Sequence, residues 1–286
     1  MTWPGAYIVV VHRDDLSCVA KQTLGAAAEA GLITVVASNG GELPEIPRFV
    51  NGGLQLENRG YGAAINDAVD WIRLQFPAIE YVCFANDDIL IPTDAFRDIA
   101  VRMDTPDEAV AYGMESHFPQ GGVYFCGGSV DWRTPRLSHW EAPQSDTVIT
   151  DSEVLNGAVI ALPLAVFLDV GGFDERFFLY FEDLDLSLRL RDLGVRLLLL
   201  RGHKVLHDGG ASTADRPAVN RSAYVRSQIL FANKWQGRRA ALRVAVRVIL
   251  RSGLGSLSFH SLSRRLRREK VRSAMSVLPL ILRTRQ

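Results

Sequence analysis

The 286-residue chain is poor in cysteine and has no long apolar run. Its three cysteines, Cys18, Cys83 and Cys126, lack the spacing of a metal site and cannot all pair with one another, so we expect reduced thiols. No stretch approaches the ~20 apolar residues of a membrane-spanning helix. The N-terminal MTWPGAYIVVV has neither the basic start nor the apolar length of a signal peptide. These absences predict a protein of the cytoplasm.

Acidic residues are almost missing from the last part of the chain. Residues 236–286 contain 13 lysines and arginines and a single acid, Glu269, whereas residues 1–235 contain 19 basic and 31 acidic residues. The formal net charge of zero therefore conceals two segments of opposite charge. We expect these segments to face different partners.

Short apolar runs alternate with helical patterns along the chain, and the middle, residues 108–150, is rich in Gly, Trp and Pro and predicts irregular or antiparallel structure. The expected strands are 6–11, 32–37, 53–57, 80–85, 157–162, 195–200 and 203–207, and the expected helices are 15–30, 60–76, 163–170, 181–193 and 217–235. This alternation predicts an α/β fold with a doubly wound, mainly parallel sheet. Ligands of such sheets bind beyond the carboxyl ends of the strands, where Ser38–Gly41 and Asn86–Asp88 would lie.

Two acidic segments carry candidate chemistry. Asn86-Asp87-Asp88 follows a buried strand, where carboxylates can hold a divalent cation against a diphosphate or simply cap a turn. Glu182, Asp183 and Asp185 follow an aromatic loop. Apolar neighbours raise the proton affinity of a carboxylate, so that it can act as a base, although acids are also favoured in the first turn of any helix.

Two further segments combine polar residues with glycine. His207 comes at a strand end just before Gly209 and Gly210, where a ligand or metal ion can approach closely, although a lone histidine is usually structural. Asn58-Arg59-Gly60-Tyr61-Gly62-Ala63-Ala64-Ile65-Asn66 has small residues at a helix start. Such residues either let backbone amides approach a phosphate or sugar, or serve a tight turn and close packing.

Together these segments resemble family 2 glycosyltransferases of the GT-A fold, especially the bacterial rhamnosyltransferase- and galactofuranosyltransferase-like branch. The resemblance covers about residues 5–215 and is carried in order by VVVH, SNGG, NRGYGAAIN, ANDDILIP, NGAVIALPLAVFLDVGGFDERFFLYFEDLDLSLRLRDLG and HDGGAS. It implies a GT-A catalytic domain over residues 1–215, with a mixed, mainly parallel sheet flanked by helices. Residues 216–286 would form a helical, basic appendage.

The resemblance implies a metal-dependent, inverting enzyme of cell-envelope polysaccharide synthesis. It would move a rhamnose-like or galactofuranose-like sugar from a dTDP- or UDP-linked donor to a hydroxyl of a glycan or polyprenyl-linked acceptor. The implied catalytic residues are Asp183 as general base and Glu182, which orients the acceptor, and the implied ligands of Mg²⁺ or Mn²⁺ are Asp88 and His207. The implied donor contacts are His12, Ser38, Asn39, Asn58, Arg59, Gly62, Asn66, Asn86 and Asp87, and the acceptor contacts are Phe178, Tyr180 and Asp185.

Two positions depart from the family pattern. Ser38 and Asn86 stand where related enzymes usually carry aspartate. They support the alternative of a catalytically silent sugar-nucleotide-binding or scaffold protein on the same fold.

The basic C-terminal segment carries an amphipathic pattern. Arg239, Arg243, Arg247 and Arg251 recur every four residues beside apolar side chains, and the further basic residues are Arg264, Arg265, Arg267, Arg268, Lys270 and Arg272. This pattern predicts a helix on anionic lipid at the inner face of the cell membrane. The alternatives are packing on the acidic catalytic domain and packing on a homodimer partner. We expect no nucleic acid partner, because interleaved aromatic residues are lacking.

Overall fold

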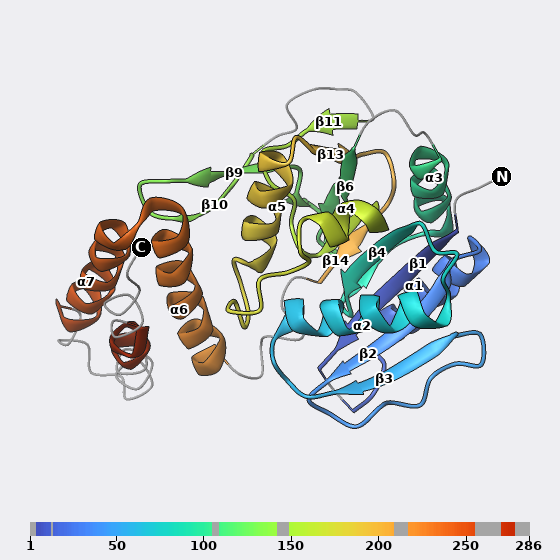
Figure 1. Ribbon diagram of the computed structural model, residues 1–286, viewed down its shortest axis with the longest axis horizontal. Helices are drawn as coiled ribbons and strands as arrows, with labels where there is room; N and C mark the ends of the chain where they lie inside the picture. Colours follow the sequence, from blue (N-terminus) through green and yellow to red (C-terminus); the bar gives the residue numbers. More distant parts are fainter. Residues whose placement is uncertain are drawn as a thin grey trace. The chain divides into compact units, whose positions relative to one another are not determined.

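The computed structural model describes residues 4–12, 14–104, 109–141, 149–208, 217–254 and 270–277 of the chain (Figure 1). Its strands are β1 (Gly5–Val11), β2 (Ile33–Asn39), β3 (Gly52–Leu56), β4 (Tyr81–Asn86), β5 (Ile89–Leu90), β6 (Val110–Met114), β7 (Ser116–His117), β8 (Val123–Phe125), β9 (Gly128–Asp131), β10 (Arg136–His139), β11 (Ile149–Asp151), β12 (Val159–Pro163), β13 (Arg196–Leu200) and β14 (Leu206–His207). Its helices are α1 (Cys18–Glu29), α2 (Tyr61–Gln75), α3 (Thr93–Met103), α4 (Leu164–Asp169), α5 (Glu182–Asp192), α6 (Pro217–Gln236) and α7 (Arg238–Leu254).

The main sheet is mixed and mainly parallel, as the resemblance implied. Its strand order is β11-β13-β6-β12-β4-β1-β2-β3. The β4-β1-β2-β3 ladders and the β6-β13 ladder are parallel. β12 lies antiparallel between β4 and β6, and β11 is antiparallel to β13. The carboxyl ends of β1, β2, β3 and β4 therefore meet at one edge, where the polar segments lie.

Alternating side chains of the central strands bury both faces of the sheet. Tyr7, Val9 and Val11 of β1 pack in one cluster with α1 and α3. On the other face, the Phe84 ring meets the Phe167 ring of α4 at 6.0 Å. Burial on both faces explains why these strands read as continuous apolar runs in the sequence.

Two features of the fold differ from the sequence expectations. The sequence analysis assigned no element to residues 93–103, which form α3. The strand expected at 203–207 is reduced to Leu206–His207, which belongs to a separate four-stranded sheet of order β5-β14-β7-β8. This short ladder pairs His207 with Ile89 and thereby brings His207 next to the end of β4.

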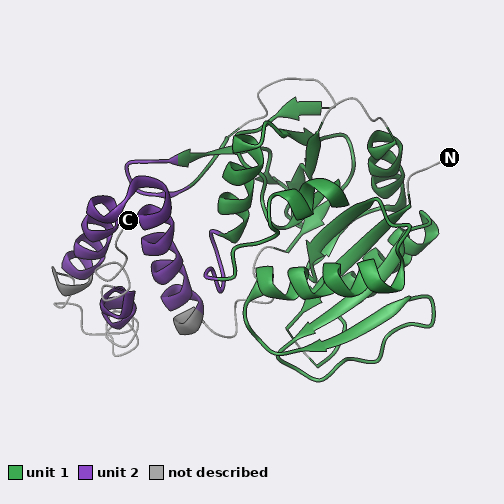
Figure 2. Ribbon diagram, viewed as in Figure 1, with its two compact units in different colours: residues 1–130, 137–175, 182–212 green, residues 131–136, 176–181, 213–286 purple. Residues whose placement is uncertain are grey.

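The chain divides into two compact units (Figure 2). Unit 1 consists of Met1–Val130, Leu137–Glu175 and Glu182–Ser212, and unit 2 consists of Asp131–Arg136, Arg176–Phe181 and Thr213–Gln286. The longest stretch of unit 2 begins at Thr213, close to residue 215, after which the sequence analysis placed the boundary. It also takes in two short stretches that the sequence analysis assigned to the catalytic domain.

Unit 2 has a small apolar core of its own. It is formed by Val225, Ile229, Ala232, Ala240, Ala241, Val244, Ala245, Ala274 and Val277, from α6, α7 and the helical residues 270–277. The expected broad apolar face of α7 is therefore divided, because one side of the helix is buried in this core. Arg264, Arg265, Arg267 and Arg268 lie outside the described residues. Within the described ranges, no helix is long and apolar enough to cross a membrane.

Candidate active site

The acidic end of β4 is held by the first helix. Ser17 caps α1 by accepting the amide of Ala20, and its hydroxyl donates to the carbonyl of Asp87 at 2.8 Å. One turn further on, the Thr23 hydroxyl donates to the carbonyl of Ile89. Buried hydrogen bonds of this kind fix the backbone, and so they set the direction of the neighbouring side chains. Asp87 and Asp88 are consequently buried at the strand end.

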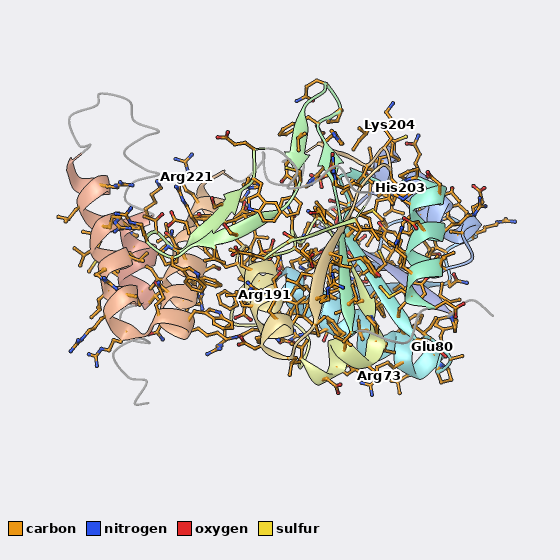
Figure 3. The ribbon with its side chains drawn as sticks, turned by 90° about the horizontal axis from the view of Figure 1, so that it is seen from above. Arg73, Glu80, Arg191, His203, Lys204 and Arg221 are labelled. Atoms are coloured by element: carbon orange, nitrogen blue, oxygen red, sulfur yellow. The ribbon has the colours of Figure 1, made fainter. Side chains whose placement is uncertain are left out.

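His207 is the histidine that reaches this acidic end. Its Nε2 lies 3.1 Å from Oδ1 of Asp88, and the Tyr124 ring packs against it at 4.2 Å between ring centroids. Its Nδ1 has no hydrogen-bond partner within the described part of the chain. His203, labelled in Figure 3, is held elsewhere, because its two ring nitrogens lie 3.1 and 3.0 Å from Asp94 and Asp98 of α3. The glycines that follow His207 in the motif lie outside the described residues.

The second pair of acids opens α5. Asp183 is partly buried, with Oδ2 accepting the amide of Gly157 at 2.9 Å and Oδ1 accepting the amide of Leu184 at 2.8 Å. An ideal β-carbon at Gly157 would lie 3.2 Å from Cβ of Asp183, so glycine permits this close approach. Glu182 is 7% exposed, and none of the described residues forms a hydrogen bond with its Oε2.

The environment gives the two acids different proton affinities. Burial and the neighbouring Asp183 raise the pKa of Glu182 well above its usual value. Burial also raises the pKa of Asp183, but the Gly157 and Leu184 amides and the nearby His139 oppose this rise. Donated hydrogen bonds stabilise a charged carboxylate. Asp183 is therefore the acid of the pair in which hydrogen bonds favour the charged form, whereas Glu182 has the more strongly raised pKa.

Tyr61 connects the two acidic pairs. Its buried hydroxyl donates to the carbonyl of Gly157 at 3.2 Å. Its pKa is raised well above 10, first by burial and then by the charges of Glu182, Asp183, Cys83 and Asp87. Next to it, the amide of Asn86 donates to the carbonyl of Ala158. Acids that lie far apart along the chain therefore act electrostatically on one tyrosine in unit 1.

Asn39 is the outstanding polar residue at the end of β2. It is 2% exposed, and neither its side-chain oxygen nor its nitrogen has a hydrogen-bond partner among the residues that the structure describes. Leaving a buried amide unpaired costs free energy, so such a group is typical of a site that a ligand completes. Ser38 differs, because its hydroxyl donates to the carbonyl of Glu42. The serine side chain thus holds the loop after β2, and its role in donor binding stays a prediction.

The resemblance implied donor contacts by His12 and Asn58, and both residues follow strands whose carboxyl ends lie at this edge of the sheet. His12 follows β1 directly and is exposed. Asn58 follows β3, and an ideal β-carbon at Gly40 would lie 2.5 Å from its Cβ. The loops after β2 and β3 are therefore in contact, as neighbouring carboxyl ends of a parallel sheet should be.

Three expected donor contacts are used to hold the Gly171–Glu175 loop instead. Arg59 forms ion pairs with Asp67 and Glu175. The Asn66 side chain donates to the carbonyl of Phe173 and accepts its amide. An ideal β-carbon at Gly62 would lie 2.6 Å from Cβ of Phe173. The small residues at the start of α2 therefore serve close packing, which was the alternative to phosphate binding.

Two residues that were expected to contact the acceptor, Asp185 and Tyr180, have protein side chains as neighbours. Asp185 has no exposed surface and pairs with Arg189 at 2.8 Å, because this position of α5 faces inward. Tyr180 belongs to unit 2, where its ring packs against Tyr224. Tyr180 and Phe181 both have left-handed backbones, with φ of 67° and 69°. Such residues cost about 1–3 kcal/mol each and persist only where the surroundings hold them. Phe178, from the same stretch, is partly exposed.

Several residues of the site were not predicted. Tyr61 and Gly157 lie within motifs that the sequence analysis quoted, but only the fold shows that Gly157 contacts Asp183 and that Tyr61 contacts Gly157. His139 and Tyr124 come from the middle of the chain, which has no clear periodicity. Burial lowers the pKa of His139, while Asp183 opposes this effect, so the histidine lies near Asp183.

A divalent cation fits the end of β4 only with help from a ligand. Among the described residues, no three side chains of His, Cys, Asp or Glu gather as a complete metal site. Asp88 and His207 nevertheless supply a carboxylate and an imidazole side by side, and no described residue forms a hydrogen bond with the buried Nδ1 of His207. Diphosphate oxygens can complete such a partial set of ligands, as they commonly do for Mg²⁺.

Known proteins resemble the chain in both sequence and fold. No protein-family model matches it. It is 28% identical over 241 residues to N-acetylglucosaminyl-diphospho-decaprenol L-rhamnosyltransferase of Mycobacterium tuberculosis, covering 75% of this chain and 77% of that protein. It is 28% identical over 178 residues to rhamnosyltransferase WbbL of Escherichia coli, covering 56% of this chain and 63% of that protein.

A solved structure shows the same architecture. The crystal structure of GalNAc-T7 with UDP, GalNAc and Mn²⁺ superposes with a TM-score of 0.62 at 11% identity. The match covers 98% of this chain but only 57% of that one, so this chain spans little more than half of GalNAc-T7. At this identity the likeness concerns the fold alone. The chain thus has the GT-A fold, and its sequence relatives confirm the resemblance to glycosyltransferases of the rhamnosyltransferase type.

Proposed function

We propose that the chain is an inverting, metal-dependent glycosyltransferase. One observation carries this proposal: Tyr61 interacts electrostatically with Glu182 and Asp183 and also with Asp87, whose neighbour Asp88 contacts His207. One pair suits a cation under a diphosphate leaving group, and the other suits a base for an incoming hydroxyl. A scaffold protein would not need a carboxylate held by two amides beside a second, protonated acid.

Asp183 acts as the general base in this proposal. The Gly157 and Leu184 amides hold its carboxylate in one orientation. They leave lone pairs that can accept the proton of an acceptor hydroxyl. The hydroxyl oxygen then attacks the anomeric carbon from the face opposite the leaving group, and this single displacement inverts the configuration. Glu182, in its protonated form, donates a hydrogen bond and so orients the acceptor.

The end of β4 and the loop after β2 take the donor. Asp88 and His207 would hold Mg²⁺ or Mn²⁺, which supplies charge stabilisation to the departing diphosphate. The unpaired amide of Asn39 offers one donor and one acceptor to the nucleobase. We propose a dTDP- or UDP-linked sugar, with dTDP-rhamnose first, because the curated relatives are rhamnosyltransferases.

The acceptor is proposed to be a sugar on a polyprenyl diphosphate. The name of the Mycobacterium tuberculosis relative includes a decaprenol-linked sugar, N-acetylglucosaminyl-diphospho-decaprenol. An acceptor of this kind lies in the bilayer plane, so the enzyme would work as a peripheral protein at the inner face of the cell membrane. The product would feed cell-envelope polysaccharide synthesis.

A donor screen tests the proposed function. Thermal shift is measured with dTDP-rhamnose, UDP-sugars, dTDP and UDP, each with and without Mn²⁺, because a tightly bound ligand raises the melting temperature. The nucleotide sugar that gives the largest shift then enters an assay for released nucleoside diphosphate. We expect metal-dependent release. Tight donor binding without any release would instead support the scaffold alternative.

The outer face of α7 supports membrane association. Arg239, Arg243, Val246 and Leu250 follow one another at helical spacing and are exposed, with Val246 and Leu250 at 53% and 56%. Two apolar side chains among arginines match the boundary between lipid headgroups and acyl chains. Each basic side chain near an anionic surface contributes about 1 kcal/mol. We propose that this face rests on anionic lipid.

Flotation with vesicles tests the membrane proposal. The wild type should float with vesicles of phosphatidylglycerol and phosphatidylcholine, but not with phosphatidylcholine alone, and salt should release it. Serine at both Val246 and Leu250 should weaken binding about tenfold or more, because little apolar area then enters the lipid. Leu74→Ser on α2, where the leucine is 79% exposed, is the matched control. Equal flotation of both variants would refute the proposed face, and a dimer in sedimentation would favour a second subunit there.

A further inference from the structure

One side of α6 contacts the segment that precedes the two proposed catalytic acids. Tyr224, Ser227, Phe231 and Lys234 succeed one another at intervals of three, four and three residues, which places them on one side of the helix. All four contact residues 177–181, which belong to unit 2 together with α6. The opposite stripe of α6 packs in the apolar core of unit 2. The helix therefore joins that core to the residues just before Glu182.

The contacts follow the segment along its length. Nζ of Lys234 lies 5.9 Å above the buried Phe177 ring. The Ser227 hydroxyl, 1% exposed, donates to the carbonyl of Leu179 at 2.9 Å. The Phe181 ring packs between Tyr224 and Phe231, at 5.2 and 5.3 Å between centroids.

The segment needs this support because of its backbone. Tyr180 and Phe181 are in the left-handed region, which residues with a β-carbon seldom adopt. Phe181 is joined by one peptide bond to Glu182, and the next residue is the proposed base. A left-handed pair that relaxed would rotate the start of α5. A shift of about 1 Å in a catalytic group can cost about a hundredfold in rate.

We propose that Ser227, with the Tyr224 ring, is a positioning residue: it fastens the left-handed segment and thereby aims Glu182 and Asp183 at the acceptor. The helical unit is then a part of the catalytic apparatus as well as a basic appendage. This inference rests on the proposed function for its kinetic part. Its structural part, the fastening of residues 179–184, stands without it.

Ser227→Ala removes the hydroxyl and little else. Its matched control is Ser222→Ala on the same helix, where the hydroxyl bonds to Ser273 within unit 2 and not to the segment. Hydrogen exchange of the amides of residues 179–184 should quicken at least tenfold in Ser227→Ala and stay unchanged in the control. Ser227→Thr, which keeps the hydroxyl, should restore protection.

Kinetics gives the second measurement. With the donor and Mn²⁺, kcat of Ser227→Ala should fall about 10- to 100-fold while the donor KM stays within twofold, and Ser227→Thr should recover most of the loss. Unchanged exchange at residues 179–184, or a KM that rises as kcat holds, would overturn the positioning role. A wild type without metal-dependent release would instead refute the proposed function, and the exchange result would still decide whether Ser227 fastens the segment.

Discussion

Replacing Asp183 by asparagine tests the proposed base most directly. In the wild type each carboxylate oxygen accepts one backbone amide, from Gly157 and from Leu184. An asparagine oxygen can keep one of these bonds, but the –NH₂ group then faces the other N–H. The variant loses the basic lone pairs and one hydrogen bond, while its volume hardly changes.

The expected magnitudes separate catalysis from stability. Removing a general base costs about 10²–10⁴ in kcat. At 1.36 kcal/mol per tenfold, this loss corresponds to about 3–5.5 kcal/mol of transition-state stabilisation. The lost hydrogen bond costs about 1–3 kcal/mol of folding free energy. Removal of a buried charge offsets part of this cost, since burial raises the pKa of Asp183. The melting temperature should therefore move by only a few degrees.

The assay follows release of nucleoside diphosphate from the donor with Mn²⁺ and a lipid-linked acceptor. Asp183→Asn should turn over at least a hundredfold more slowly, and the thermal shift caused by dTDP or UDP with Mn²⁺ should be unchanged. Asp70→Asn, at an exposed carboxylate of α2, is the control and should behave as the wild type. Turnover of Asp183→Asn within a factor of ten of the wild type would refute the assignment of the base.

Three more predictions follow from the site. In Asp88→Asn and in His207→Ala, the Mn²⁺ concentration needed for the thermal shift by nucleoside diphosphate should rise tenfold or more. Each substitution changes one of the two proposed protein ligands of the metal ion. In thermal melts, Glu182→Gln should become more stable relative to the wild type as the pH rises from about 4 to 7. The pKa of Glu182 is raised in the folded state, so the folded wild type binds more protons over this range than the unfolded chain does. The wild type therefore loses stability as the pH rises, whereas glutamine does not titrate. Gly62→Ala should destabilise by about 1–3 kcal/mol in denaturant unfolding, since the methyl group would overlap Phe173.

Each prediction has an outcome that contradicts it. Retention of the full metal-dependent shift by both variants at the end of β4 would place the cation elsewhere. A stability difference between Glu182→Gln and the wild type that does not change with pH would show that the acid is charged in both states. If Gly62→Ala had the same free energy of unfolding as the wild type, the loop that carries Phe173 would have to shift at no cost to make room for the methyl group.

The sequence predicted the edge of the sheet where the site lies. Apolar runs of five or six residues marked β1, β2 and β4, because strands buried on both faces carry no polar alternation. Carboxyl ends of parallel strands must meet, so Asn39 and Asp88 could be placed near each other without a structure. Their different surroundings could not be predicted, since an unpaired amide and a His–Asp contact depend on loops from elsewhere in the chain.

The sequence alone could not predict what each face of a helix contacts. Asp185 has the same local pattern as Asp183, yet Arg189 pairs with it in the interior, whereas the Gly157 amide reaches Asp183. The apolar residues of α7 belong to two faces with different surroundings, and only the position of α6 separates them. A periodic pattern tells which residues share a face, but the partner of that face comes from tertiary packing.

The antiparallel placement of β12 has a consequence for how enzymes on this frame could diversify. Backbone hydrogen bonds join β12 to β4, and Gly157, two residues before β12, donates its amide to Asp183. The interval between the proposed metal site and the proposed base is thus spanned largely by main-chain atoms, which every amino acid supplies. Substitutions around the rim can exchange one sugar or acceptor for another while this interval is inherited unchanged.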